Sequence, residues 1–219
     1  IQAMVACIQP EPMKSIADPP CGTGGFFLVA NEWLSGTGHW LKENADWLQR
    51  ETPKLNRTQA RFLREETFYG NEIVPSTRRM CLMNLFLHNI GELYGEPAIE
   101  RSDALISEPK TKVDYVLANP PFGKKSSMTI TNEEGDEDRD ALTYERQDFW
   151  ETTSNKQLNF LQHIVSMLKL DGKAAVVLPD NVLFEGGAGE KIRRKLLEEC
   201  DVHTILRLPT GIFYAQGVK

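Results

Sequence analysis

The sequence lacks the features that mark several common classes of protein. Its four cysteines lie far apart and form no C-x-x-C pair, so we predict reduced thiols and no zinc or other metal site. No signal peptide and no run of about 18 or more apolar residues occurs, so we expect no membrane span. Internal repeats and low-complexity tracts are lacking as well. Together these absences favour a cytoplasmic protein.

An excess of basic residues is also lacking. Lys and Arg total 25 against 31 Asp and Glu, which gives a net charge of −6. A domain that binds DNA independently needs clustered basic side chains to neutralise phosphates. If nucleic acid is the substrate, a basic partner or a segment outside this chain must supply much of the contact. Because the sequence begins at Ile1 without a methionine and stops at Lys219 without a closing signal, we expect it to be part of a longer polypeptide.

The length and composition fit one large α/β domain over residues 1–219. Hydrophobic residues make up 41% and charged residues 26%, which is ordinary for a globular protein. Short apolar stretches alternate with helical ones, which predicts a mostly parallel sheet with helices on both faces and right-handed crossovers. The predicted strands are residues 15–18, 67–73, 97–105, 113–118, 174–178 and 203–208.

Helices are predicted between these strands from apolar spacing and glycine stops. The predicted helical stretches are 1–10, 26–33, 75–90, 158–168 and 190–200, with Gly91 and Gly172 as stops. In the third of them, Met80, Met83, Leu87 and Ile90 form a stripe that we expect to face the core rather than a cofactor.

Two longer stretches interrupt this alternation. Residues 36–66 are polar with scattered aromatic and leucine anchors, which predicts a helical insertion of one or two helices. Residues 124–154 are polar and contain an acidic cluster, which predicts a mobile loop. Loops of about 30 residues without structure are usually functional or disordered.

A tetrapeptide, Asn119-Pro120-Pro121-Phe122, follows the strand predicted at 113–118. Open α/β sheets bind ligands at the carboxyl ends of their strands, where this tetrapeptide is expected. Two successive prolines remove two backbone donors and stiffen the turn, so it presents an amide side chain, free carbonyls and an aromatic ring. That set suits an exocyclic amine on a flat ring. The alternative is a strand-ending turn with a core phenylalanine.

A glycine-rich turn, Gly22-Thr23-Gly24-Gly25, follows the first predicted strand and precedes a helix. This arrangement is typical of sites for anions or polar ligands. The dinucleotide-binding fingerprint has a glycine where this sequence has Phe27, which disfavours a pyrophosphate as the ligand.

Acidic residues follow the second and third predicted strands. Glu72 stands where an acid commonly binds a ribose, although a carboxylate that stabilises a helix N-terminus is the alternative. Asp103 either accepts a hydrogen bond from a purine amine or caps a loop. Because parallel strands end at one edge, these residues, the glycine turn and Asn119 predict a single cleft.

These segments, in this order, resemble the motifs of adenine-N6 DNA methyltransferases, in particular the modification subunit of type I restriction-modification systems. The segments are Asp18-Pro-Pro-Cys-Gly-Thr-Gly-Gly-Phe-Phe, Gly70-Asn-Glu72-Ile and Asn119-Pro-Pro-Phe122, with further likeness at Thr77-Arg-Arg-Met80 and Leu208–Phe213. The resemblance implies a Rossmann-like methyltransferase fold. It also implies that an upstream segment that closes over the cofactor, and a last antiparallel strand beginning near Gly217, are missing here.

The resemblance implies a role for each motif residue. Asp18, Pro19, Gly22, Thr23, Gly24 and Gly25 bind the methionine moiety of S-adenosylmethionine; Glu72 binds its ribose and Asp103 its adenine. Asn119 and the Pro120 carbonyl accept the two hydrogens of adenine N6, Pro121 stiffens the turn, and Phe122 stacks on the base. Asn119 also borders the cofactor, and Phe213 is a candidate for a second aromatic face.

The implied reaction is N6 methylation of adenine in double-stranded DNA after base flipping, with a separate specificity subunit that reads the DNA sequence. A restriction subunit and a second modification subunit are further implied partners. Three alternatives stay open: an Asn-Pro-Pro methyltransferase acting on cytosine N4, RNA guanine or protein glutamine; a non-catalytic cofactor-binding domain; and a dinucleotide dehydrogenase, which Phe27 disfavours.

Overall fold

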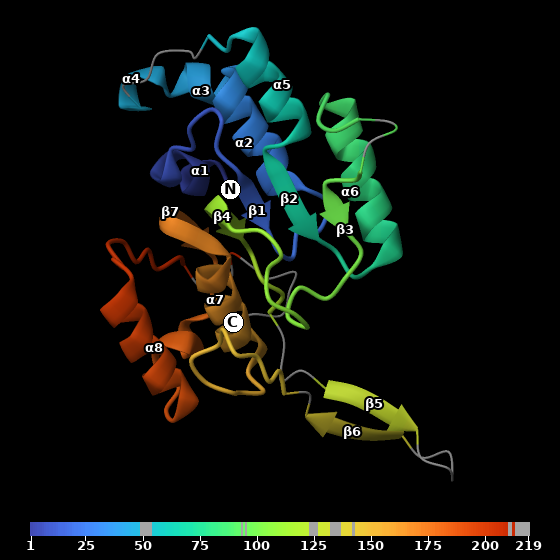
Figure 1. Cartoon of the computed structure of the whole chain (residues 1–219). Coiled ribbons are helices and arrows are strands. Elements are labelled where there is room, and N and C mark those ends of the chain that lie inside the picture. Colours follow the sequence, from blue (N-terminus) through green and yellow to red (C-terminus); the bar gives the residue numbers. More distant parts are fainter. Residues whose placement is uncertain are drawn as a thin grey trace. The chain divides into compact units, whose positions relative to one another are not determined.

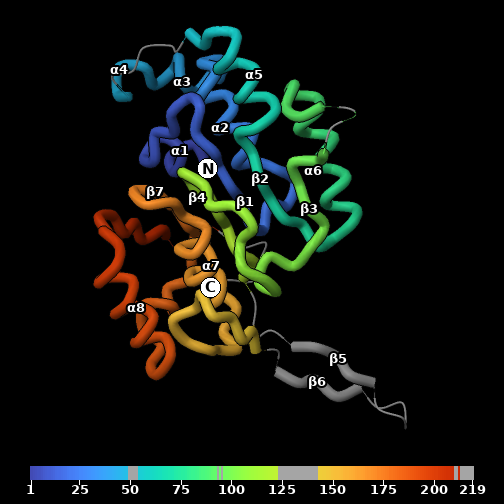
Figure 2. Tube along the Cα trace, viewed as in Figure 1, coloured from blue at the N-terminus to red at the C-terminus, as the bar shows by residue number. Residues whose placement is uncertain are grey.

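The computed structural model describes residues 1–48, 54–92, 94, 96–122, 127–131, 137–141, 143–209 and 212 (Figures 1 and 2). Contacts within the chain divide it into two compact units. The sheet unit comprises Ile1–Ala104, Pro109–Asn119 and Met167–Val177, and the second unit comprises Leu105–Glu108, Pro120–Ser166 and Leu178–Lys219. The chain passes from the first unit to the second at three points, one of which lies between Asn119 and Pro120. That the two form a single domain stays a prediction.

Five strands form the parallel sheet of the sheet unit, in the order β3-β2-β1-β4-β7. Their bounds are β1 Ile16–Asp18, β2 Phe68–Asn71, β3 Ile99–Glu100, β4 Val113–Ala118 and β7 Leu168–Val176. The central strand pairs on both sides, with Ile16 opposite Phe68 of β2 and Tyr115 of β4. The predicted α/β class with a mostly parallel sheet is confirmed.

The sheet unit also contains helices, and α1, α2 and α6 pack on these strands. The bounds of the helices are α1 Gln2–Ile8, α2 Gly25–Ser35, α3 His39–Glu43, α4 Ala45–Leu48, α5 Arg57–Glu65 and α6 Pro75–Leu87. Helix α2 lies against β1, α6 against β3, and α1 against β4 and β7. Phe27 of α2 contacts Phe68 of β2 with ring centroids 5.4 Å apart, at the centre of the apolar core.

In the stretch 36–66, predicted to hold one or two helices, the described residues form three short ones, α3, α4 and α5. Figure 1 shows them beyond the amino-terminal ends of β1 and β2. Trp40 of α3 stacks on Trp33 of α2 with ring centroids 5.9 Å apart. Asn56 and Gln59 form a capping box that begins α5, because each side chain accepts a hydrogen bond from the other residue's backbone amide.

The second unit has its own smaller core. Its elements are the hairpin strands β5 Ser127–Thr131 and β6 Glu137–Ala141, helix α7 Lys156–Met167, a 3-10 turn at Asp180–Leu183, and helix α8 Ala188–Glu199. Leu158 and Leu161 of α7 pack against Val182 and against Ile192 of α8.

The expectation of a loop without structure over 124–154 differs from the structure. Strands β5 and β6 pair antiparallel, with Ser127 opposite Ala141. The acidic residues of this stretch fall partly in β6 and partly outside the described residues. A hairpin was not predicted because polar, charged sequence lacks the alternating apolar residues that identify a strand.

Three further sequence-based expectations are wrong. Of the predicted stripe, Met80, Met83 and Leu87 are 50%, 64% and 75% exposed, and Ile90, which follows α6, is buried as predicted. Cys81 and Leu85 form the buried face of α6 instead. Apolar residues occur all round this helix, so spacing alone could not select the buried face.

The other two errors concern 168–172 and 203–208. Helix α7 ends at Met167 rather than at Gly172, and β7 begins directly at Leu168, with a register shift against β4. Residues 203–208 form no strand and are exposed. Their alternating pattern is local, whereas a strand also needs a neighbouring strand for its backbone groups.

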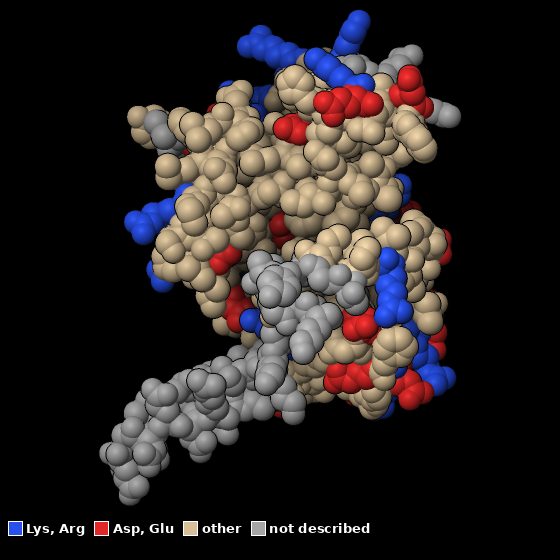
Figure 3. Space-filling view, turned by 180° about the vertical axis from the view of Figure 1, so that it is seen from behind, with Lys and Arg blue, Asp and Glu red and all other residues tan. Residues whose placement is uncertain are grey.

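The surface has basic and acidic side chains interspersed, as Figure 3 shows for one face. Arg61 and Arg64 of α5, for example, both lie within 4.0 Å of glutamate oxygens.

No helix of the described part of the chain is long and apolar enough to cross a membrane.

Candidate functional site

The candidate site lies at the carboxyl ends of β1, β2 and β4. These three strands are parallel neighbours, with β1 in the middle. Asp18 is the last residue of β1, and Asn119 directly follows β4. Glu72 directly follows β2. The sheet therefore brings these three predicted site residues to one edge, within one compact unit.

Asp18 is almost fully buried, with 2% of its surface exposed. Its Oδ1 atom has no hydrogen-bond partner among the described residues. Burial raises the pKa of Asp18 well above its usual value, and the nearby Cys81 and Glu72 raise it further. A buried carboxyl oxygen without a donor costs stability unless a ligand supplies one. A cationic or N–H donor ligand fits this position.

Asn119 presents a second buried acceptor on the neighbouring strand. Its Oδ1 atom is also buried and has no partner among the residues that the structure describes. The β4 backbone just before it is fixed, because the Ala118 carbonyl accepts from Val177 N at 2.9 Å. A buried amide oxygen without a donor suits an amine hydrogen of a ligand.

The glycine turn connects β1 to α2 in a tight conformation. Cys21 N donates to the Asn71 carbonyl at 3.1 Å, and Gly24 N donates to the Cys21 carbonyl at 2.9 Å. Gly24 has a φ of +84°, and a Cβ atom there would lie 2.9 Å from the Sγ of Cys81. The turn therefore needs glycine at this position both for its backbone angle and for space.

Glu72 serves the turn that follows β2. Its Oε1 accepts from Val74 N at 2.7 Å, just before α6 begins at Pro75. This contact supports the alternative of a carboxylate near a helix N-terminus. A role in binding a ribose stays a prediction.

Asp103 lies in the segment that follows β3 and is partly buried. The neighbouring Ser102 accepts a hydrogen bond from Asn71 Nδ2 at 2.8 Å, so this segment is held at the carboxyl end of β2. Its predicted contact with a purine amine is consistent with that placement and stays a prediction.

The remaining predicted site residues are described less fully. Pro120 is buried, Pro121 is exposed and Phe122 is partly buried, and all three belong to the second unit. Phe213 lies outside the described residues. The roles predicted for these four residues stay predictions.

Comparison with known proteins agrees with this arrangement. A family model described as N-6 DNA Methylase matches residues 1–219. The chain belongs to the N-6 DNA methylase family.

Individual relatives place it near the type I restriction enzymes. The chain is 41% identical over its whole length to the EcoKI methylase subunit of Escherichia coli K12, and 40% identical to the StySPI methylase subunit of Salmonella potsdam. It spans 37% of the length of each of these relatives.

Solved structures agree. The crystal structure of the EcoKI M protein matches 99% of this chain and 40% of that one, with a TM-score of 0.77 and 40% identity. The crystal structure of a modification subunit of a putative type I restriction enzyme from Vibrio vulnificus matches 90% of this chain and 36% of that one, with a TM-score of 0.64 and 26% identity. The predicted resemblance to type I modification subunits and the predicted methyltransferase fold are confirmed.

Two residues of this methylase chain that contact the glycine turn were not predicted. Asn84 Nδ2 of α6 donates to the Thr23 carbonyl at 3.0 Å, and Cys81 Sγ lies 4.0 Å from Cys21 Sγ. Neither residue is charged or part of a known spacing. Only the topology could have indicated these contacts. Helix α6 follows β2, and β2 is the neighbour of β1, so this order brings α6 near the turn that follows β1.

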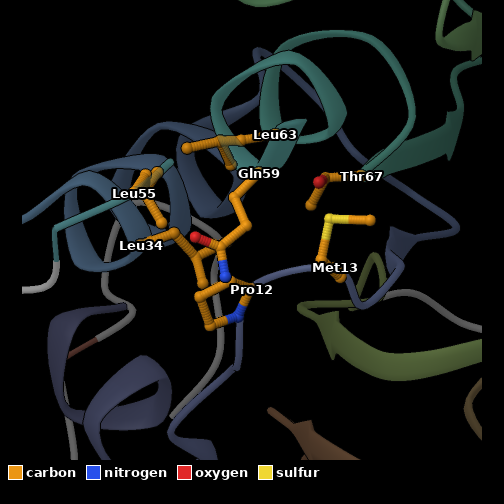
Figure 4. A pocket seen from close by; sticks show the side chains of 7 residues that line it. All are labelled: Pro12, Met13, Leu34, Leu55, Gln59, Leu63 and Thr67. Atoms are coloured by element: carbon orange, nitrogen blue, oxygen red, sulfur yellow. The ribbon is translucent and has the colours of Figure 1, made fainter. Parts of the chain in front are cut away.

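The hollow shown in Figure 4 is not this site. Its lining includes Met13, which precedes β1, and Thr67, which precedes β2. It therefore lies at the amino-terminal ends of the strands, opposite the edge that carries Asp18 and Asn119. Its other lining residues are Pro12, Leu34, Leu55, Gln59 and Leu63.

Proposed function

We propose that the protein containing this chain transfers a methyl group from S-adenosylmethionine to N6 of adenine in double-stranded DNA. The supporting observation is the pair of buried acceptors without partners, Asp18 Oδ1 and Asn119 Oδ1, on adjacent parallel strands. A methyltransferase needs one group that holds the donor and one that holds the target amine. Neighbouring strand ends supply both.

The residues at this edge fit S-adenosylmethionine chemically. Asp18 offers a carboxyl oxygen to the cationic methionine moiety, and the turn from Pro19 to Gly25 surrounds it. Glu72 is proposed to bind the ribose and Asp103 the adenine. When bound, the cofactor supplies an electrophilic methyl group on a sulfonium.

Asn119 is proposed to act on the target base. Its Oδ1 and the Pro120 carbonyl accept the two N6 hydrogens, which draws the nitrogen toward tetrahedral geometry and localises its lone pair. The N6–carbon bond forms while the sulfur–carbon bond breaks, and an N6 proton is released. Positioning alone contributes roughly 7–11 kcal/mol in well-oriented reactions, so no strong base is required.

The proposed mechanism gives no role to His163. It lies in the second unit and is 3% exposed. Burial, together with the neighbouring Arg146, lowers the pKa of His163 to about 3, and Arg146 Nη1 lies 2.9 Å from its Nδ1. This histidine is therefore neutral and engaged in a buried contact.

The adenine must leave the duplex to react, which costs a few kcal/mol. Phe122 is proposed to stack on the extruded base and to return about 1–3 kcal/mol. The chain has a net charge of −6, which disfavours tight binding to DNA phosphates by this chain alone. Most of the contact with DNA is therefore assigned to a specificity subunit. A restriction subunit and a second modification subunit are further proposed partners, in the cytoplasm.

The test is transfer of a tritiated methyl group to duplex DNA by the native protein, with and without its specificity subunit. Labelled N6-methyladenine is expected, and Asn119→Ala is expected to reduce it by about 100-fold or more, as loss of one preorganised hydrogen-bonding group does elsewhere. Asn44→Ala, at an exposed residue ending α3, is the matched control and should leave transfer unchanged.

Other outcomes reassign the function. Label in cytosine, RNA or protein alone would change the substrate. Full transfer by Asn119→Ala would remove the catalytic assignment and leave a cofactor-binding domain. A calorimetric preference for NAD over S-adenosylmethionine would indicate a dehydrogenase.

A further inference from the structure

Helix α6 contacts the glycine turn at Thr23 and the residue that precedes the turn, Cys21. Asn84 Nδ2 donates to the Thr23 carbonyl at 3.0 Å, and Cys81 Sγ lies 4.0 Å from the Sγ of Cys21. These residues are three apart, so they lie on neighbouring positions of one helix face. All four belong to the sheet unit.

The bond from Asn84 fixes the orientation of one peptide group. A trans peptide places its carbonyl and its N–H on opposite sides. With the Thr23 carbonyl bound by Asn84, the Gly24 N–H points the other way and donates to the Cys21 carbonyl at 2.9 Å. This peptide is therefore held from both sides, in a turn whose Gly24 has a φ of +84°.

Cys81 limits the space behind the same peptide. It is 0% exposed, and a Cβ atom added to Gly24 would lie 2.9 Å from its Sγ. The turn thus rests on the thiol and cannot move toward α6. Asn84 prevents it from moving away, because that movement would break the hydrogen bond.

The helix itself is anchored to the sheet. Arg78 Nε of α6 donates to the Ile99 carbonyl of β3 at 2.8 Å. Helix α6 also begins directly after the Glu72 turn. One helix therefore links the strand end that carries Glu72 to the glycine turn that follows Asp18.

We infer that Asn84, with Cys81 behind it, is a positioning residue that holds the glycine turn in the conformation that binds the methyl donor. This inference rests on the proposed function. Asn84 acts through the Thr23 carbonyl, not by contact with the reacting atoms. Its loss therefore weakens cofactor binding and leaves the rate at saturating cofactor largely intact.

The test is equilibrium binding of S-adenosylmethionine to the native protein and to two variants. Asn84→Ala removes the donor, and a net hydrogen bond corresponds to about 2- to 10-fold weaker binding. Asn84→Asp keeps the shape but places an oxygen against the Thr23 carbonyl. The expected order of affinity is wild type, then Asn84→Ala, then Asn84→Asp.

A purely packing role gives a different order. The isosteric Asn84→Asp would then bind as well as wild type, and only Asn84→Ala would be weaker, which would overturn the inference. Met83→Asp is the matched control for the added charge, since Met83 is 64% exposed on the same helix. It should bind the cofactor as wild type does.

Kinetics separate this inference from the proposed function. The KM for S-adenosylmethionine is expected to rise in the Asn84 variants while kcat stays within about 2-fold of wild type. Wild-type protein that binds no S-adenosylmethionine would refute the proposed function. If the wild-type protein binds S-adenosylmethionine and both Asn84 variants bind it with the same affinity as wild type, only the role of Asn84 is refuted.

Discussion

The two edges of the parallel sheet treat their aspartates in opposite ways. At the amino-terminal edge, Asp114 of β4 accepts from Ser15 N at 2.9 Å, from Ser15 Oγ at 2.8 Å and from Lys169 Nζ at 2.8 Å. At the carboxyl edge, Asp18 of β1 keeps one oxygen without a partner among the described residues. Asp114 therefore obtains its hydrogen-bond donors from the chain itself, whereas the free oxygen of Asp18 can accept from a ligand.

The pKa values of the two carboxyl groups express the same difference. Burial would raise the pKa of Asp114, but the bonds from Lys169 and Ser15 outweigh it and lower the pKa to about 2. Burial raises the pKa of Asp18 well above its usual value, and the neighbouring Cys81 and Glu72 raise it further. One aspartate stabilises the fold, and the other is held at a cost that ligand binding can offset.

The largest expected effect follows from changing the carboxyl edge. Asp18→Asn should weaken binding of S-adenosylmethionine by about 10- to 100-fold, because an amide cannot ionise to pair with the cationic methionine moiety. It should not lower the thermal midpoint of the ligand-free protein, since it removes a buried group without a donor. Calorimetric titration and thermal unfolding of the native protein measure the two quantities.

If Asp18→Asn loses stability but keeps its affinity for the cofactor, the difference drawn between the two edges is wrong. It would make Asp18 a structural residue like Asp114.

A smaller effect is expected at the amino-terminal edge. Asp114→Asn should lower the free energy of unfolding by about 1–2 kcal/mol, because charged hydrogen bonds to Lys169 and Ser15 are lost. Affinity for the cofactor should stay as in wild type. Thermal unfolding measures the loss, and unchanged stability would show that the network at this edge contributes nothing.

The smallest expected effects are two opposite dependences of stability on pH. The folded pKa of Asp114, about 2, lies below the unfolded value of about 3.9. Its contribution is therefore present above about pH 4 and lost as the pH falls toward 2. The folded pKa of Asp18 is raised instead, so keeping its carboxyl group buried makes the protein less stable as the pH rises above about 4.

Thermal midpoints across this range separate the two. Asp114→Asn should reduce the loss of stability on the acid side of the profile, and Asp18→Asn should reduce the loss of stability above about pH 4. A profile in which both variants change the same side would contradict the assignment.

The sequence predicted best where chemistry and periodicity coincide. The strand at 113–118 is an apolar run ended by two prolines, and β4 has those bounds. Because parallel strands share an edge, the placement of Asp18, Glu72 and Asn119 together followed from the order of strands and helices alone.

Features that depend on tertiary neighbours were not predictable. The buried face of α6 is set by what it packs against, so Cys81 rather than Met83 faces inward. The contact between Asn84 and Thr23 joins residues 61 positions apart and has no local signature. Residues 203–208 have the pattern of a strand, but a pattern cannot supply the neighbouring strand.

The glycine turn also sets where a chemist could alter this protein without closing the site. A Cβ atom at Gly22 would meet nothing within 4 Å, and its φ of +55° is one that asparagine tolerates. Gly24 has no such room. A spectroscopic probe attached through position 22 would therefore report on the turn that is proposed to bind the methyl donor, whereas any substituent at position 24 would push against α6.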